Sequence, residues 1–306
     1  MELKTQHLTV TLRSPAEGLF SERLDTCAVV RQVVLHGRHR FCQPEQLRPD
    51  RATCRGEGLC GEFVWDSLAA EAAPGQRFPK LGVGLLTQRP EGGAYDMWKH
   101  YEVQPYPIRW QQQADRVTFI QTLTPCLGVA GCLVKELRAA ENTLTLTATL
   151  ENTGTRLLDV WEYQHNFVAI DALPVGPGYR LELPLDGAVA GIDQAAHHLP
   201  DRSVPAPGVL RAQGQTVVWD QPMQGREYHK TTEAAALLPC PDFTWRLRHA
   251  DSPAAVSETV QFSPARLVLW GIEHCVCTEV YAHWQVAPGA SQTFARTWRF
   301  TDEAVS

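Results

Sequence analysis

The stretch Thr143-Leu-Thr-Leu-Thr-Ala-Thr-Leu-Glu151 decides the fold class, because every second residue in it is apolar. Such alternation is typical of a β-strand that has one face on a core and the other toward solvent. Upstream, residues 132–138 form a second candidate strand, joined to the first through residues 139–142. Downstream, Asn152-Thr-Gly-Thr155 has turn chemistry, and residues 156–169 resume an extended pattern. The sequence therefore predicts three antiparallel strands in series, a meander.

The same period of two recurs along the rest of the chain. Further candidate strands occupy residues 7–13, 27–36, 81–87, 116–124, 179–183, 215–219, 243–249, 256–262, 266–271, 275–286 and 291–300. Only residues 43–52 and 66–73 have helical patterns, and both segments are short. The Pro- and Gly-rich stretch 170–214 is flanked by strands without a lasting change in composition, so we interpret it as an elaborated loop region. We predict one all-β domain over residues 1–306, a large antiparallel β-sandwich.

Composition narrows the class of protein. The 306 residues include 28 Lys and Arg against 34 Asp and Glu, and a pI near 6.0 without a basic run argues against a nucleic-acid partner. No apolar run approaches the roughly 18 residues of a membrane span, so no membrane partner is expected. The first residues lack the apolar core of a signal peptide, so we expect a cytoplasmic location. Nine Trp with 22 Gly and 21 Pro favour a turn-rich β scaffold with an aromatic surface for a ligand.

The nine cysteines suggest neither a disulfide framework nor a metal site. Their number is odd, no two form a CxxC pair, and no His spacing around them fits zinc. We expect reduced cysteines, as in the cytosol, and neither a metal nor a cofactor. Cys275 and Cys277 lie two apart on a candidate strand and face the same side, so a catalytic or redox role is the alternative interpretation.

The first candidate for chemistry is the strand Val160-Trp-Glu-Tyr-Gln-His-Asn-Phe-Val168. Alternation places Trp161, Tyr163, His165 and Phe167 on one face and Glu162, Gln164 and Asn166 on the other. A His among aromatic residues is more often a hydrogen-bonded core residue than a catalyst. Here both faces carry polar groups, so neither is a simple core face. Aromatic rings beside an imidazole suit a sugar, whose C–H faces stack on the rings while the imidazole reaches an oxygen.

The second candidate is Glu279, in the middle of the apolar strand from Cys275 to Trp284. It shares a face with Tyr281, which we nominate for substrate binding. A carboxylate at such a position is costly unless it is paired or functional. Burial would raise its pKa toward the range of a general base. The alternative is a structural Glu that pairs with an Arg or a Trp N–H.

Two further segments carry candidate binding residues. Residues 95–110 are dense in aromatic side chains, and Pro105 and Pro107 predict a loop or an edge strand there. Such a segment suits either a binding rim or a solvated loop. Its nominated members are Lys99, His100, Arg109 and Trp110. Farther along, His229 and Lys230 lie together in polar surroundings, where an ordinary surface turn is the alternative.

The order of these features resembles the galactose mutarotase (aldose 1-epimerase) superfamily, whose fold is a β-supersandwich. The turn at residues 152–154, followed by Gln164-His-Asn-Phe167, is similar to the family's turn–strand–His block. Thr278-Glu-Val-Tyr281, followed by Ala287-Pro-Gly289 and Phe294-Ala-Arg-Thr-Trp-Arg-Phe300, looks like the family's last strands. The family's His is a general acid and its Glu a base, so the resemblance implies these roles for His165 and Glu279.

The resemblance also covers positions where this sequence departs from the family. His100 falls about ten residues before Trp110, where mutarotases place a second active-site His, but the glycines that flank that His are missing here. The segment with His229 and Lys230 falls where the family places an Asp that binds sugar hydroxyls, and it contains no Asp. The substitute for that hydroxyl-binding Asp is therefore left open.

The function that the resemblance implies is cofactor-independent interconversion of sugar anomers. One group removes the proton of the anomeric hydroxyl while another protonates the ring oxygen, and each contributes about 10²–10⁴-fold. We expect His165 and Glu279 to converge across a sugar-sized gap, with Trp161 and Tyr163 in the floor and His100 near an oxygen of the sugar. The partner is a small-molecule sugar, and a homodimer is left open.

Two alternatives remain from the sequence. One is a non-catalytic carbohydrate-binding or sensor protein on the same fold, favoured by the missing Asp. The other is a lyase or epimerase that acts on an acidic or phosphorylated sugar. The charge of such a substrate would be neutralised by Lys99, Arg109, His229 and Lys230.

Overall fold

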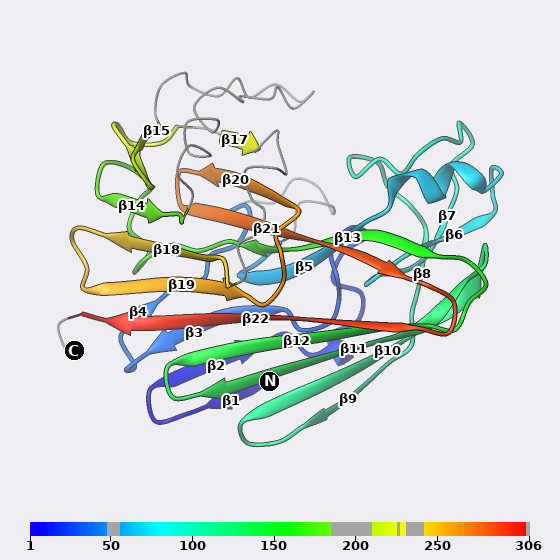
Figure 1. Ribbon diagram of the computed structural model, residues 1–306, viewed down its shortest axis with the longest axis horizontal. Helices are drawn as coiled ribbons and strands as arrows, with labels where there is room; N and C mark the ends of the chain where they lie inside the picture. Colours follow the sequence, from blue (N-terminus) through cyan, green and yellow to red (C-terminus); the bar gives the residue numbers. More distant parts are fainter. Residues whose placement is uncertain (48–55, 185–209, 225–226, 231–241, 304–306) are drawn as a thin grey trace.

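The structure is a computed structural model, and two large antiparallel sheets dominate it (Figure 1). It describes residues 1–47, 56–184, 210–224, 227–230 and 242–303, and only the backbone of 210–212 and 227–230. The all-β class and the antiparallel sandwich that the sequence predicts are confirmed. Among the residues described, no helix is long and apolar enough to cross a membrane.

The first sheet carries the candidate site. In spatial order its strands are β1 (Glu2–Lys4), β2 (Leu8–Leu12), β3 (Val30–Leu35), β5 (Leu59–Val64), β13 (Leu158–Asn166), β21 (Cys275–Val286), β20 (Arg266–Ile272) and β17 (Glu227–Lys230), and β4 (His39–Arg40) pairs with β3. Gly58 directly precedes β5 and has φ +55°, and a Cβ there would lie 1.9 Å from the carbonyl oxygen of Val30. Glycine is therefore required where β3 and β5 approach each other.

The second sheet forms the opposite layer. In spatial order its strands are β15 (Leu210–Gln213), β16 (Thr216–Trp219), β14 (Tyr179–Glu182), β18 (Thr244–His249), β19 (Ala254–Val260), β22 (Ser291–Asp302), β12 (Thr143–Asn152), β11 (Val129–Ala140), β10 (Arg116–Cys126) and β9 (Ile108–Gln112). A small third sheet contains β6 (Arg77–Lys80), β7 (Gly84–Thr87) and β8 (Val103–Pro105). In the part of the chain that the structure describes, the 3₁₀ helices η1 (Pro15–Glu17) and η3 (Asp66–Glu71) lie between strands.

The apolar core lies between the two large sheets. In β12 the residues Leu144, Leu146 and Leu150 are buried and the threonines between them are not, as the alternation predicts. The same core contains Trp284 of β21 and Trp298 of β22, both fully buried. Part of the high tryptophan content therefore fills the core instead of serving a ligand.

The predicted meander is wrong in its third strand. β11 and β12 pair as expected, but β12 pairs on its other side with β22, and β13 belongs to the opposite sheet. The crossing is fixed by Asn152, whose buried Nδ2 donates to the carbonyls of Arg156 and Val286. Its Oδ1 accepts from the N–H of Gly154. The turn residues therefore tie the two sheets together instead of closing a hairpin.

The helical predictions fare differently. The prediction over 66–73 is right in place, since η3 covers Asp66–Glu71, although the helix is of the 3₁₀ type. The prediction over 43–52 is wrong for residues 43–47, where Pro44 forms an isolated β-bridge with Glu57, and residues 48–52 lie outside those described. Of the predicted loop region 170–214, residues 185–209 likewise lie outside them, and β14 lies within its described part.

Candidate functional site

Strands β13 and β21 bring the two nominated catalytic residues together. The antiparallel register that pairs Val168 with Val276 places His165, three residues earlier, opposite Glu279, three residues later. His165 Nδ1 lies 2.9 Å from Glu279 Oε1, and both side chains are buried. Residues more than a hundred positions apart in sequence thus form one buried pair.

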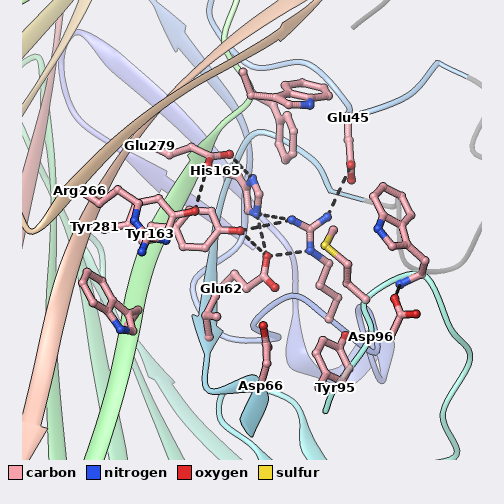
Figure 2. A pocket seen from close by; sticks show the side chains of 17 residues that line it. Glu45, Glu62, Asp66, Tyr95, Asp96, Tyr163, His165, Arg266, Glu279 and Tyr281 are labelled. Carbon is pink, nitrogen blue, oxygen red and sulfur yellow. Dashed lines mark hydrogen bonds and ion pairs between the residues drawn. The ribbon is translucent and has the colours of Figure 1, made fainter. Parts of the chain in front are cut away.

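Neighbouring strands extend the same face of the sheet. On one side, β5 pairs with β13 and places Glu62 opposite Tyr163. On the other side, β20 pairs with β21 and places Arg266 opposite Tyr281. Four adjacent strands therefore present polar and aromatic side chains on one floor, as Figure 2 shows.

This floor opens into a cavity of about 470 Å³, which suits a small molecule such as a sugar. The side chains lining it are mainly aromatic or acidic, with two arginines and one histidine: Arg23, Glu45, Glu62, Val64, Asp66, Tyr95, Asp96, Met97, Trp98, Trp161, Tyr163, His165, Phe167, Arg266, Trp270, Glu279 and Tyr281. Tyr163 and Tyr281 both line it, and their rings stack on each other at 4.2 Å between ring centroids.

His165 is held between two carboxylates. Besides Glu279 at Nδ1, Glu62 Oε2 lies 3.1 Å from its Nε2. The same Glu62 oxygen accepts hydrogen bonds from Tyr163 Oη at 2.6 Å and from Arg23 Nε at 2.7 Å. Arg23 also brings Nη2 to 3.2 Å from His165 Nε2. The site is therefore a connected buried network, drawn with dashed lines in Figure 2.

The charges of this network change the acidity of its members. Burial lowers the pKa of His165, but Glu279 and the hydrogen bonds to Glu279 and Glu62 outweigh it and raise that pKa above its usual value. Burial raises the pKa of Glu62, but Arg23, Lys80 and His165 together bring it below its usual value. An imidazolium beside ionised Glu62 is the state that these shifts favour, and an imidazolium can act as a general acid.

The expectation of a sugar-sized gap between His165 and Glu279 is wrong, because the two side chains touch. The close contact agrees with the chemistry, since the anomeric hydroxyl oxygen and the ring oxygen are bonded to the same carbon. An acid and a base that serve these two oxygens must lie near each other. The volume for the rest of a sugar is the cavity beside the pair and not a space between them.

The ends of the cavity differ in charge. Arg266 lies with its guanidinium carbon 4.8 Å from the ring centroid of Trp161 and 5.3 Å from that of Tyr281. Asp66 and Asp96 line the cavity away from Arg266, as Figure 2 shows. Carboxylates accept hydrogen bonds from sugar hydroxyls, so these two aspartates could serve in place of the Asp missing near His229 and Lys230.

Not all nominated residues reach this site. Trp161, Tyr163, His165, Glu279 and Tyr281 line the cavity. The side chain of His100 is 82 % exposed, lies outside the lining and places Nδ1 2.6 Å from Glu22. Lys99, Arg109 and Trp110 are also exposed and outside the lining. The backbone of His229 and Lys230 lies in β17 beside β20, and their side chains are not among those described.

Two central residues, Arg23 and Glu62, were not found by sequence reasoning. Glu62 had the same signal as Glu279, a carboxylate within an apolar strand, but β5 itself was not predicted. Arg23 gave no signal, because it lies in an irregular segment between η1 and β3. The segment 95–110 does reach the cavity, through Tyr95, Asp96, Met97 and Trp98 rather than through its nominated members.

The cysteines that the structure describes are not among the residues that line the cavity. Cys275 and Cys277 are buried and pack with Cys60, Phe167 and Trp270. The cysteines within the described residues are free thiols, and Cys54 and Cys240 lie outside them. Within the same residues, no group of three or more His, Cys, Asp or Glu side chains could hold a metal ion.

Comparison with solved structures identifies the fold. The chain is similar to a galactose mutarotase-like protein from Lactobacillus casei, with a TM-score of 0.60, 10 % identity and coverage of 98 % of this chain and 99 % of that one. It is similar to a galactose mutarotase related enzyme from Lactobacillus acidophilus, with a TM-score of 0.57, 10 % identity and coverage of 98 % and 97 %. For a GalM/aldose epimerase homologue from C. elegans the values are 0.51, 11 %, 99 % and 98 %.

The chain therefore has the galactose mutarotase-like β-supersandwich fold. No protein-family model and no curated protein matches its sequence. The resemblance that the His165 and Glu279 blocks indicate is thus confirmed at the level of the fold. Fold alone does not fix an activity.

Proposed function

We propose that the protein is a cofactor-independent aldose 1-epimerase-like enzyme that interconverts the anomers of a sugar. The observation that carries the proposal is the contact of 2.9 Å between His165 Nδ1 and Glu279 Oε1, on the floor of a cavity of about 470 Å³. An acid and a base side by side are what the two oxygens of one anomeric carbon require.

The proton transfers follow from this pair. Glu279 takes the proton of the anomeric hydroxyl, and His165 gives a proton to the ring oxygen. The bond between the anomeric carbon and the ring oxygen breaks, and a carbonyl forms at the anomeric carbon. After rotation of the aldehyde, His165 takes its proton back from the former ring oxygen, and Glu279 returns its proton to the new anomeric hydroxyl.

The remaining lining suits a sugar. The rings of Trp161, Tyr163 and Tyr281 line the cavity and offer apolar surface for C–H groups. Asp66 and Asp96 offer acceptors for hydroxyl groups away from the reacting carbon. Such a site needs only positioned side chains for its proton transfers.

The direct test measures anomer exchange by NMR over a panel of aldoses. We expect wild-type protein to accelerate exchange of at least one aldose, and His165→Gln to lose that acceleration. Arg109→Gln, exposed and outside the cavity, is the matched control and should retain it. Saturable sugar binding in isothermal titration without any exchange would instead support the carbohydrate-binding alternative.

A second candidate function, action on an acidic or phosphorylated sugar, is favoured by Arg266. Among the described residues its guanidinium makes no ion pair, whereas Arg23 pairs with Glu62 and Glu45. A guanidinium held over aromatic rings at the cavity can donate to a carboxylate or phosphate of a substrate. Exchange confined to uronic acids or sugar phosphates, and lost in Arg266→Gln, would establish this candidate over a neutral aldose. The cytoplasmic location and a homodimer stay predictions.

A further inference from the structure

The two carboxylates at His165 are held with very different firmness. Glu62 Oε2 accepts from Tyr163 Oη at 2.6 Å and from Arg23 Nε at 2.7 Å, and Glu62 is buried. Glu279 Oε2 accepts from Tyr281 Oη at 3.4 Å, near the limit of a hydrogen bond. Glu62 is therefore fixed behind the imidazole, while Glu279 can turn toward a ligand.

The positions of the two carboxylates define the protonation of the ring. A neutral imidazole has one N–H donor, so it can donate to one carboxylate only. Contacts of 2.9 Å and 3.1 Å from both nitrogens to carboxylates fit an imidazolium that donates twice. When this imidazolium gives up one proton, the second proton stays on the nitrogen whose carboxylate acceptor is held more firmly in place.

We propose that Glu62 is a positioning residue that keeps a proton on Nε2 of His165 and thereby makes Nδ1 the nitrogen that exchanges a proton with the sugar. This inference rests on the proposed function. His165 gives its Nδ1 proton to the ring oxygen, and Glu62 continues to accept from Nε2–H. The Nδ1 lone pair is then directed toward the ring oxygen, ready to take the proton back on reclosure.

Arg23 supplies the competing arrangement. Its Nη2 lies 3.2 Å from His165 Nε2, and a guanidinium can only donate. If Glu62 no longer accepts from Nε2, Arg23 can donate to a lone pair there, and the single proton moves to Nδ1 beside Glu279. In that tautomer Nδ1 already carries a proton and cannot take one back from the former ring oxygen. Glu62 therefore prevents a form of His165 that cannot complete the reaction.

Other ionisable groups surround the ring and enter any dependence on pH. Those that face His165 or its partners from β5, β13, β20, β21 and the covering segments are Arg23, Glu45, Cys60, Glu62, Lys80, Tyr163, Arg266, Cys277, Glu279 and Tyr281. Burial raises the pKa of the Cys60 and Cys277 thiols and of the Tyr163 hydroxyl well above their usual values, so these groups stay neutral near pH 7.

The experiment reads the tautomer directly. Full-length protein labelled with ¹⁵N in histidine is compared as wild type and Glu62→Gln by ¹H–¹⁵N correlation over pH 5–9, with His165→Gln identifying the His165 signals. We expect wild-type His165 to titrate from imidazolium to the Nε2–H form. In Glu62→Gln the negative charge beside Nε2 is lost, so the neutral form should appear at lower pH and part of its population should shift to Nδ1–H. An unchanged tautomer and titration in folded Glu62→Gln would overturn the proposal.

Kinetics add a second measurement. With an accepted aldose, Glu62→Gln should lower kcat about 10- to 100-fold, the range found for outer carboxylate partners of functional histidines, with KM changed much less. Its rate should also depend on pH differently from wild type. If kcat and KM of Glu62→Gln changed by similar factors and its pH profile matched that of wild type, Glu62 would have a merely structural role and the proposal would be overturned.

A second variant at the same position keeps the test decisive. Glu62→Asp retains the charge that Arg23 and Lys80 require but withdraws the oxygen from Nε2, so it carries the same test if thermal melts show that Glu62→Gln is unfolded. If no aldose is exchanged by wild type, the proposed function fails, and the tautomer measurement still decides the role of Glu62.

Discussion

The two faces of strand β13 both carry buried polar groups, but they differ in what lies beyond them. On one face, Tyr163 and His165 border the cavity. On the other, Glu162, Gln164 and Asn166 lie between the sheets, buried and outside the cavity lining. We call the first the cavity face of β13 and the second its inter-sheet face.

The polar side chains of the inter-sheet face bond to other buried side chains. Arg296 donates to Glu162 at 2.7 Å and to Glu258 at 3.2 Å. Asn166 donates to Glu258 at 3.1 Å and accepts from Trp298 Nε1 at 2.9 Å. These partners come from both sheets, so the network fixes how the sheets stack. On the cavity face, by contrast, the charges border a volume that a ligand can enter.

A buried carboxylate in a strand does not by itself mark a catalytic site. Glu258 and Glu279 are both buried in apolar strands, and only Glu279 reaches the cavity. Access to a ligand, rather than burial or charge, separates the two roles. The following substitutions are chosen as matched pairs across the two faces.

The largest effect is expected for the pair Glu279→Gln and Glu258→Gln. Removing the base should lower the rate of anomer exchange about 10²–10⁴-fold, the usual contribution of a general base, while the protein stays folded. Glu258→Gln should instead lower the melting temperature and leave the rate of the folded protein near wild type. NMR exchange rates and thermal melts of both variants check this. Full exchange activity in Glu279→Gln would remove it as the base.

The next effect compares two arginines. Arg296→Met leaves Glu162 and Glu258 buried without their cation, so we expect a loss of about 3–5 kcal/mol in the free energy of unfolding. Arg266→Met removes a half-buried guanidinium that stacks on Trp161, and should cost much less. Urea unfolding of both variants measures the difference. Equal losses would mean that the closed network does not carry the stability assigned to it.

Strand β13 also shows which structural features the sequence predicts and which it does not. Alternation correctly separated the cavity-face residues from those of the inter-sheet face. The resemblance nominated His165 and Glu279, and the structure places these two side chains in contact. Alternation and resemblance both depend on local pattern. The pairing of β13 with β5 and β21 depends on the crossing at Asn152, and a local pattern does not state which sheet a strand joins.

The same reason explains the misplaced residues. His100 lies in a segment of which Tyr95, Asp96, Met97 and Trp98 reach the cavity. Spacing along the chain does not show which side chains of an irregular loop turn inward. Arg23 enters the network from such a segment and has no periodic pattern around it. Residues on regular strands were therefore placed better than residues on loops.

A smaller effect is expected for Asn166→Ala and Tyr163→Phe. Asn166 makes three buried hydrogen bonds, with Glu258, the Thr278 carbonyl and Trp298. Each buried partner left without a hydrogen bond costs about 1–3 kcal/mol in the free energy of unfolding. Tyr163→Phe removes one donor to Glu62, which keeps Arg23. We expect Asn166→Ala to lose more stability by chemical unfolding. The reverse order would show that the cavity face holds the fold as firmly as the inter-sheet face.

The smallest expected effect is a dependence of stability on pH that comes from the cavity face. The pKa of folded His165 is raised above its ordinary value despite burial, because Glu279 and Glu62 favour its charged form. The stability from this charge is therefore fully present below the ordinary pKa of a free histidine, about 6.5, and is lost as pH rises through the folded pKa. Melting temperatures of wild type and His165→Gln, measured from pH 5 to 9, isolate this contribution by difference. The wild type should lose stability relative to the variant as pH rises. A constant difference across this range would mean that His165 does not carry the charge that the two carboxylates favour.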